Sequence, residues 1–489
     1  MRRSRKKNSV FAAWRTAHGV GLLLFERYRV SQSRETVVAD VVSARYVPFA
    51  FSGRRTFRPH RVTQERSAML SSRQSYFFLA LLILALCIRI AAAIAIDRHV
   101  TAEGRQFLIE GDANGYWELG QKIAAGQEYS IYTPPRRVLR TPGFPLLLAA
   151  SIRLFGNSIF AASLVMAVVG AACCGLTAVL ARQLTDNRTA LWALALVAIS
   201  PIQVGSNVQI LSETWFSFWL LLSLVAAAAL FSDRPTGSGS GGRDLRQSLI
   251  SGIATGLTVL VRPGWILWPW LSSLIVLTCG RQAFARRLLM CGLIFAGCYL
   301  ALLPWAWRNH TVTGHWIFTS LWSGPSLYDG LHPGATGASD MTFVDQESVY
   351  TTMSEFDANA HYKQRALEFA AANPVRTAAL AFHKAARYLS PTLNASGFSG
   401  GLSSVFCLLW YAGFWGLVAI GSLDLRKSRA ALMLLTGPFL QFLLVHMVFV
   451  GSIRYRLPVE FPLSIIAAKG LDFLQRKYRS DKADSQLMR

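Results

Sequence analysis

The chain has 489 residues, of which 52% are hydrophobic and 16% are charged, and its mean hydropathy is +0.34. Soluble domains carry about 25% charged residues, so this composition excludes an ordinary soluble protein and indicates a membrane protein. The net charge of +24 would suit a nucleic-acid-binding protein. Nucleic acid is excluded as a partner, because Lys and Arg gather in the tails and in short loops between apolar runs.

Residues 1–70 differ from the rest, being rich in Arg and Ser and free of long apolar runs. Two interpretations stay open: a transit peptide, or a reading frame that starts too early, with the protein beginning at Met69. We therefore treat 1–70 as a basic N-terminal extension that need not belong to the mature protein. One transmembrane domain is expected over 71–489.

Apolar runs that could cross a bilayer number about ten, since a hydrocarbon core of about 30 Å needs about 20 helical residues. The third and fifth are short or interrupted. Every second connection between the runs is basic, and both ends of this domain fall on the same side, which the positive-inside rule assigns to the cytoplasm. The runs lie at about 76–96, 158–181, 189–205, 212–231, 248–262, 265–280, 285–305, 401–423, 430–450 and 456–473.

Two long loops, about 97–157 and 306–400, then face outward. The first contains a helix that starts near Asp112 and an apolar helix that ends at Phe155 and is too short to span. The second contains an amphipathic stretch, divided at Asn373-Pro374, that is typical of an interfacial helix pair. Surface helices are therefore expected in both outer loops.

Arginines on the outer side are exceptions to the positive-inside rule, and they therefore indicate where a functional site could lie. Charges near membrane depth cost a few kcal/mol, so they tend to face a cavity and a partner. Several arginines that converge on one face predict a site for an anion, and the guanidinium fork matches the oxygens of phosphate. The candidate phosphate ligands are Arg140, Arg262, Arg308, Arg454 and Arg456.

Two carboxylates share the outer face and are the candidate catalytic groups, Asp112 and Glu213. Structural alternatives stay open for both: Asp112 could only cap a helix, and Glu213 could cap a helix or pair with an arginine. A metal ligand set is unknown, because the histidines of the outer loops match no named spacing. A divalent cation stays an open possibility.

Six segments, in this order along 76–473, resemble the GT-C glycosyltransferases, and in particular the bacterial relatives of protein O-mannosyltransferase and of the lipid A aminoarabinose transferase (glycosyltransferase family 39). Each is weak alone, and the ordered set is more specific. They are Gly111–Leu119, Arg140–Pro145 with the apolar helix to Phe155-Gly156, Ser212-Glu213, Thr258–Pro263, Pro304–Asn309 and Arg454–Pro458.

This resemblance implies an all-α polytopic bundle in the inner (plasma) membrane, with an active site that faces the periplasm or exterior. It implies a sugar donor on a polyprenyl phosphate, a protein, lipid or glycan acceptor, and contact with membrane lipids. An acidic residue in the first outer loop of such enzymes acts as base or helps to bind a metal, and Asp112 is the matching position. The chain departs from the two named relatives at Ala113, where they carry a second acidic residue, which leaves the substrate class open.

Two other classes compete with the glycosyltransferase. A transporter or flippase of lipid-linked sugars would explain many spans, but it predicts charged groups near mid-membrane, and we identify none in the sequence. An O-antigen ligase or polymerase usually has one large outer loop late in the chain, whereas here the first loop carries the acid.

Overall fold

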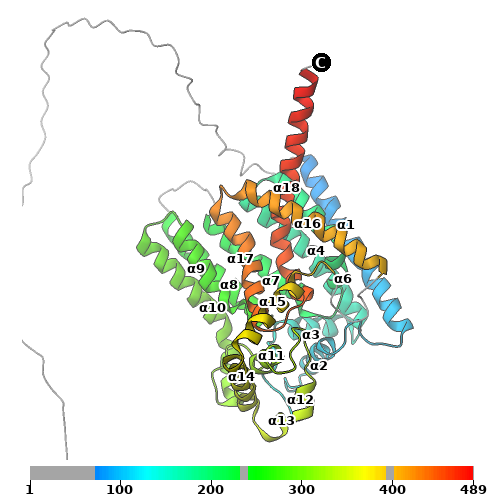
Figure 1. Cartoon of the computed structure of the whole chain (residues 1–489), viewed down its shortest axis with the longest axis vertical. Helices are drawn as coiled ribbons and strands as arrows, with labels where there is room; N and C mark the ends of the chain where they lie inside the picture. Colours follow the sequence, from blue (N-terminus) through cyan, green and yellow to red (C-terminus); the bar gives the residue numbers. More distant parts are fainter. Residues whose placement is uncertain (1–71, 232–239, 393–400, 488–489) are drawn as a thin grey trace, which may run out of the picture. The chain divides into compact units, whose positions relative to one another are not determined.

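The computed structural model describes residues 72–231, 240–392 and 401–487, all within one compact unit, Arg61–Arg489. The expected extension 1–70 lies outside the described residues. The described residues form α-helices and short 3-10 helices without a β-strand (Figure 1), which confirms the all-α prediction.

Six helices in the described ranges are long and apolar enough to cross a membrane, and each coincides with a predicted span. The chain is therefore a multi-pass membrane protein. The six are α1 (Ser72–Ala102), α4 (Ile159–Leu184), α7 (Ser212–Ala228) with the 3-10 turn η1 (Ala229–Phe231), α10 (Phe284–Thr313), α16 (Gly401–Leu425) and α17 (Arg429–Val448).

The other four predicted spans are helical as well, but they are too short or too polar for that criterion, so six of the ten predicted spans meet it among the described residues. The four are α5 (Asn187–Ile199) with α6 (Pro201–Ser206), α8 (Ser240–Val259), η2 (Pro263–Leu267) with α9 (Trp268–Cys279), and α18 (Ile453–Leu487). Two of the runs are divided into shorter helices: α5 ends at Ile199 before α6 begins at Pro201, and the 3-10 helix η2 precedes α9.

Shorter helices fill the two predicted outer loops and lie at the end of the helical unit opposite the C-terminal half of α18 (Figure 1). The short apolar helix and the division at Asn373-Pro374 are both confirmed. These helices are α2 (Asp112–Ala124), α3 (Gly143–Phe155), α11 (Ser323–Gly330), α12 (Thr342–Glu347), α13 (Val349–Thr352), α14 (Glu355–Ala372) and α15 (Pro374–Leu389).

Helix α15 buries Lys384 beside Leu380 and Tyr388 and exposes several apolar side chains. Lys384 Nζ donates to the carbonyl of Val448 at 2.7 Å, and Arg387 Nε donates to the carbonyl of Gly451 at 3.1 Å. On the other side, Val375 and Phe382 are 84% and 71% exposed. This arrangement is the one expected of a helix at a lipid interface, where apolar side chains meet the acyl chains.

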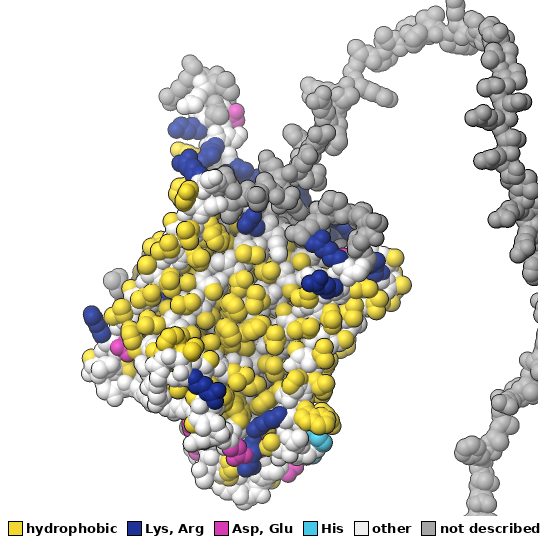
Figure 2. Space-filling view, turned by 180° about the vertical axis from the view of Figure 1, so that it is seen from behind, with side chains coloured by type: hydrophobic (Ala, Val, Ile, Leu, Met, Phe, Trp, Pro, Cys, Tyr) yellow, Lys and Arg dark blue, Asp and Glu magenta, His cyan; other side chains and the backbone are white. Residues whose placement is uncertain are grey.

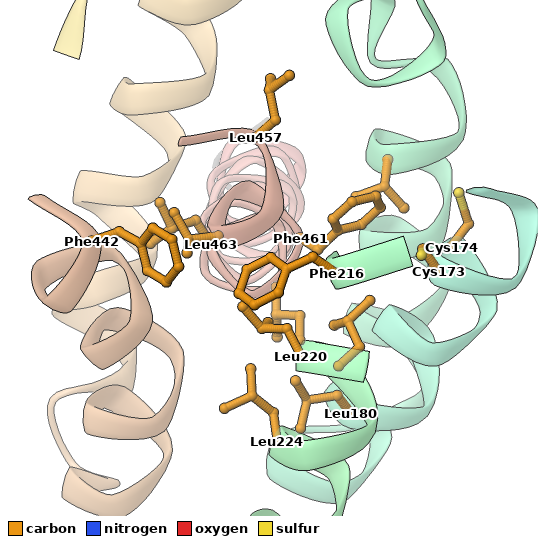
Figure 3. Packing of buried hydrophobic residues seen from close by; sticks show 14 of the residues in the cluster. Cys173, Cys174, Leu180, Phe216, Leu220, Leu224, Phe442, Leu457, Phe461 and Leu463 are labelled. Atoms are coloured by element: carbon orange, nitrogen blue, oxygen red, sulfur yellow. The ribbon is translucent and has the colours of Figure 1, made fainter. Parts of the chain in front are cut away.

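The core forms where α4, α7, α17 and α18 meet (Figure 3). Phe216 and Leu220 of α7 and Phe461 of α18 are fully buried there. Cys173 and Cys174 of α4 belong to the same cluster, and all seven cysteines are free thiols, as expected of small residues in membrane helices. This packing holds the first turns of α7 and α18 close together, and these turns carry two candidate site residues.

A broad band of hydrophobic side chains crosses the face shown in Figure 2, and Lys and Arg gather near the C-terminal end of α18. Ion pairs join several helices near that end: Arg188 to Asp472 at 3.0 Å and Lys469 to Asp186 at 2.9 Å. Basic residues assigned to different cytoplasmic connections therefore share one end of the bundle, as the predicted topology requires.

Reporter fusions test this topology. A fusion after Lys427, between α16 and α17, is expected to report the cytoplasm, because that turn belongs to the basic end. Fusions after Gly126 and Gly337, in the two predicted outer loops, are expected to report the exterior in an alkaline phosphatase and green fluorescent protein assay. A cytoplasmic signal at Gly126 would place Asp112 on the wrong face and contradict the site assignment.

Candidate active site

Asp112 is the first residue of α2 and has two arginine partners. The N-cap is Gly111 at φ 78°, a backbone conformation that favours glycine, and no side chain caps the helix. The capping alternative for Asp112 is therefore wrong. Its Oδ1 accepts a hydrogen bond from Arg140 Nη2 at 2.8 Å, and its Oδ2 lies 3.0 Å from Arg454 Nη1. The whole carboxylate is directed at guanidinium groups.

The surroundings of Asp112 favour its ionised form. Burial raises the pKa of Asp112, but the charges of Arg140 and Arg454 outweigh burial and hold this pKa well below its ordinary value. The side chain keeps an exposed fraction of 37%, the largest in the cluster of charges. Asp112 is thus a carboxylate that water and ligands can reach.

Glu213, the second residue of α7, is held by two arginines and is only 4% exposed. Its Oε1 lies 2.6 Å from Arg262 Nη1 and accepts a hydrogen bond from Arg454 Nε. No side chain caps α7, so the arginine-pair alternative for Glu213 is the one observed. Arg454 therefore bridges the two carboxylates, with Nε on Glu213 and Nη1 on Asp112.

Arg140 is positioned by α2 as well as by its own loop. Tyr116 follows Asp112 by one helical turn, so both side chains lie on the same face. The Arg140 guanidinium lies 4.2 Å from the centre of the Tyr116 ring while it bonds Asp112. Tyr129 donates to the Arg140 carbonyl at 3.1 Å. The aromatic face and the carboxylate together fix the direction of this guanidinium.

Arg262 lies in the bend between α8 and η2, which is joined to the turn that follows Arg140. Thr141 Oγ1 donates to the Val261 carbonyl at 3.2 Å, and Gly143 N donates to the Leu260 carbonyl at 2.8 Å. These bonds connect segments about 120 residues apart in the sequence. They place Arg140 and Arg262 around the same pair of acids.

Gly143→Ala is expected to separate these two segments. A Cβ at Gly143 would lie 2.7 Å from the Leu260 carbonyl oxygen, a backbone atom that cannot move aside as a flexible side chain can. Overpacking of this kind costs about 1–3 kcal/mol, so we expect a lower unfolding temperature and a lower transfer rate. Gly292→Ala in α10 is the control, because nothing lies within 4 Å of its Cβ. Equal unfolding temperatures for the two variants would contradict the close approach.

The cluster of Asp112, Glu213, Arg140, Arg262 and Arg454 carries one net positive charge. Three of its buried polar atoms make no hydrogen bond among the described residues, and two of them are N–H donors: Arg140 Nε, Arg262 Nη1 and Glu213 Oε2. Arg262 Nη1 has only its ion pair with Glu213. Buried polar groups without partners are uncommon and call for an explanation. A positive cluster with unmet hydrogen-bonding capacity can accept an anion.

The structure places the other two candidate arginines elsewhere. Arg308 donates to the carbonyls of Arg137 at 2.7 Å and Tyr129 at 3.2 Å, which fastens α10 to the first outer loop. Arg456 is fully buried, and it pairs with Glu460 at 2.7 Å and donates to the Tyr388 carbonyl. Neither guanidinium joins the cluster.

Arg89 is a buried charge that sequence reasoning missed, although a lone arginine inside the apolar run 76–96 was a readable signal. It is fully buried in α1 and donates to Asn207 Oδ1 at 3.0 Å and to the Val197 carbonyl at 3.1 Å. The interpretation that no charged group lies near the middle of a predicted span is therefore wrong. All its hydrogen-bond acceptors are neutral oxygens, so no carboxylate balances its charge there. The acceptors outside α1 lie at the ends of α5 and α6, and Arg89 thus connects α1 to these two helices.

Within the part of the chain that the structure describes, no group of three or more His, Cys, Asp and Glu side chains could hold a metal ion. The two carboxylates of the cluster face arginines instead. A cavity of about 240 Å³ lies on the other side of the first turn of α2, against Ala113, the outer end of α1 and the start of α4. None of the five residues of the cluster lines this cavity.

Residues 139–307 match the profile of a family described as dolichyl-phosphate-mannose-protein mannosyltransferase. An oligosaccharyltransferase structure from Archaeoglobus fulgidus in the apo form is similar at a TM-score of 0.52 and 16% identity, over 86% of this chain and 53% of that one. The fold is that of the GT-C glycosyltransferases. The resemblance predicted from six ordered segments is thus confirmed at the level of the GT-C fold.

Two further structures that match the chain carry bound molecules. The oligosaccharyltransferase AglB from the same organism, in complex with an inhibitory peptide and a dolichol-phosphate, matches at a TM-score of 0.51 and 14% identity, over 85% of this chain and 52% of that one. ArnT from Cupriavidus metallidurans, bound to undecaprenyl phosphate, matches at 0.41 and 14% identity, over 82% of this chain and 78% of that one. The chain spans about half the length of the oligosaccharyltransferases. No curated protein matches it.

Proposed function

We propose that the chain is a membrane glycosyltransferase that moves a sugar from a polyprenyl-phosphate donor to an acceptor at the non-cytoplasmic face. The observation that carries this proposal is the cluster itself, in which Arg140 and Arg454 contact a reachable carboxylate, Asp112. A third arginine, Arg262, is held beside them by Glu213. The GT-C fold and the family profile over 139–307 support it, and that range includes Arg140, Glu213 and Arg262.

The arginines are assigned to the donor phosphate. Arg140, Arg262 and Arg454 can give charge-assisted hydrogen bonds to phosphate oxygens, which are among the strongest in proteins. Arg308 and Arg456 are left out of this assignment, because backbone carbonyls and Glu460 occupy them. The net positive charge of the cluster favours a singly charged phosphodiester over a neutral ligand.

Asp112 is assigned as the general base. It takes the proton of the acceptor hydroxyl while the acceptor oxygen forms a bond to the anomeric carbon of the sugar. The bond between that carbon and the phosphate oxygen breaks, and its electron pair leaves with the polyprenyl phosphate. The arginines stabilise the charge that develops on this leaving group. A phosphate is a weak base and needs little help from a general acid, so one carboxylate is sufficient.

A reconstituted assay tests the proposal. The purified protein in lipid vesicles is supplied with radiolabelled sugars on polyprenyl phosphate and with membrane extract as a source of acceptors. Transfer of label into a glycoprotein, a glycolipid or a glycan is the expected result, and mass spectrometry of a deletion strain identifies which product is lost. Movement of the labelled lipid across the vesicle without a new glycosidic bond would favour a flippase instead.

A further inference from the structure

Arg454 contacts both carboxylates of the cluster. Its Nε bonds Glu213 and its Nη1 bonds Asp112, while Arg140 occupies the other oxygen of Asp112. Phosphate binding and proton abstraction, the two functions proposed for this cluster, need those same groups. An arginine that binds phosphate has to turn donors toward the phosphate, and a base that accepts a proton needs an oxygen that is free of guanidinium groups.

The two carboxylates differ in how easily an incoming anion can replace them. Glu213 is 4% exposed and contacts Arg262 as well as Arg454, so it lies on the closed side of the arginines. Asp112 is 37% exposed and lies on the open side. An anion that enters from the open side meets the donors now used by Asp112, whereas the contacts to Glu213 stay covered.

We propose that the donor phosphate displaces Asp112 from Arg454 and Arg140, so that the base becomes free only when the donor is bound. This inference rests on the proposed function and adds the regulation of the same site. Glu213 is then a positioning residue, which holds Arg262 and Arg454 side by side throughout. Until the donor binds, Asp112 takes the place of the phosphate on Arg140 and Arg454.

The electrostatics of Asp112 agree with this order of events. The arginines hold the pKa of Asp112 well below its ordinary value, which makes the carboxylate a poor proton acceptor as long as they contact it. A phosphate that neutralises Arg140 and Arg454 removes the main cause of this lowering, and the pKa of Asp112 rises. An acceptor hydroxyl that arrives before the donor therefore meets an inactive base, which suppresses unproductive chemistry.

Binding of undecaprenyl phosphate tests the displacement, with the full chain in nanodiscs of neutral phosphatidylcholine. Asp112→Asn removes the competing charge, so it is expected to bind this lipid more tightly than the wild type, by about fivefold or more, the lower range of coupling between sites. Asp112→Ala is the second variant and should show the same direction. Equal or weaker binding in both variants would overturn the proposal.

Two controls separate displacement from a general effect of charge. Glu118→Gln makes the same change of charge on α2, at an exposed residue that pairs with Lys122, and should leave the affinity unchanged. Glu213→Gln makes it inside the cluster but loosens Arg262 and Arg454, so it should not tighten binding and should raise the donor KM more than it lowers kcat. Tightening by Glu213→Gln as large as that by Asp112→Asn would contradict the displacement.

The failure of this inference can be told apart from the failure of the proposed function. If the wild type binds undecaprenyl phosphate and transfers sugar, but the Asp112 variants bind no more tightly, only the displacement is wrong. If the wild type neither binds this lipid nor transfers any sugar from a polyprenyl phosphate, the proposed function is wrong as well.

Discussion

Asp112→Asn is expected to lower the turnover number by about 10²–10⁴-fold, the usual contribution of a general base, while expression stays near normal. Asparagine keeps the size of the side chain and can still accept a hydrogen bond from Arg140, but it cannot take a proton at neutral pH. Because Gly111 is the N-cap of α2, no capping interaction is lost. Rates measured at saturating donor isolate this effect from changes in donor affinity.

Glu118→Gln is the matched control for this experiment, since it lies on the same helix and changes the charge by the same amount. It is expected to keep full turnover. Full turnover in Asp112→Asn would remove Asp112 from the role of base, and Glu213 would be the next carboxylate to test.

Arg454→Ala is expected to lower kcat/KM for the donor by about 10²–10³-fold, comparable to the loss of one preorganised donor that stabilises a developing negative charge. Arg454 alone contacts both carboxylates, so its loss removes a phosphate ligand and the link between the two acids. Each acid keeps one partner, Arg140 for Asp112 and Arg262 for Glu213, which limits the damage to the fold.

Arg426→Ala tests whether any loss of positive charge has this effect. Arg426 is exposed in the turn between α16 and α17, at the end expected to face the cytoplasm. We expect donor use to stay within twofold of the wild type, roughly the range of surface substitutions. Similar losses in the two arginine variants would mean that Arg454 acts through the general field of the protein and not through contact with phosphate.

Hydrophobicity predicted where the helices lie, because each predicted span coincides with a helix. It did not predict which helices are long and apolar enough to cross alone. Helix α18 shows the reason: it carries Arg454, Arg456 and Glu460 in its first two turns, and these charges are satisfied inside the protein rather than by lipid. The mean hydropathy of a stretch of sequence cannot predict ion-pair partners that other helices supply to its charged residues.

All five outer-face arginines were predicted to bind phosphate, and topology alone could not show which of them lie together in the cluster. Arg454 and Arg456 are two residues apart on one helix, and at 3.6 residues per turn their side chains point about 200° apart. Only one of them can face Asp112, and sequence position does not say which. Whether Asp112 faces the arginines depends on the exact residue at which α2 starts. If Asp112 were the N-cap, its carboxylate would turn toward the backbone.

Helix α15 has a consequence for the vertical position of the site. Its exposed side chains, such as Val375 and Phe382, favour contact with acyl chains. Lys384 and Arg387 donate hydrogen bonds to the end of α17 and to the segment between α17 and α18. That segment leads directly into Arg454. We therefore expect the depth of α15 in the bilayer to influence the height of Arg454 relative to the acyl chains. A phosphate carried on a membrane lipid has a fixed height of its own, so bilayer thickness becomes a variable of the enzyme.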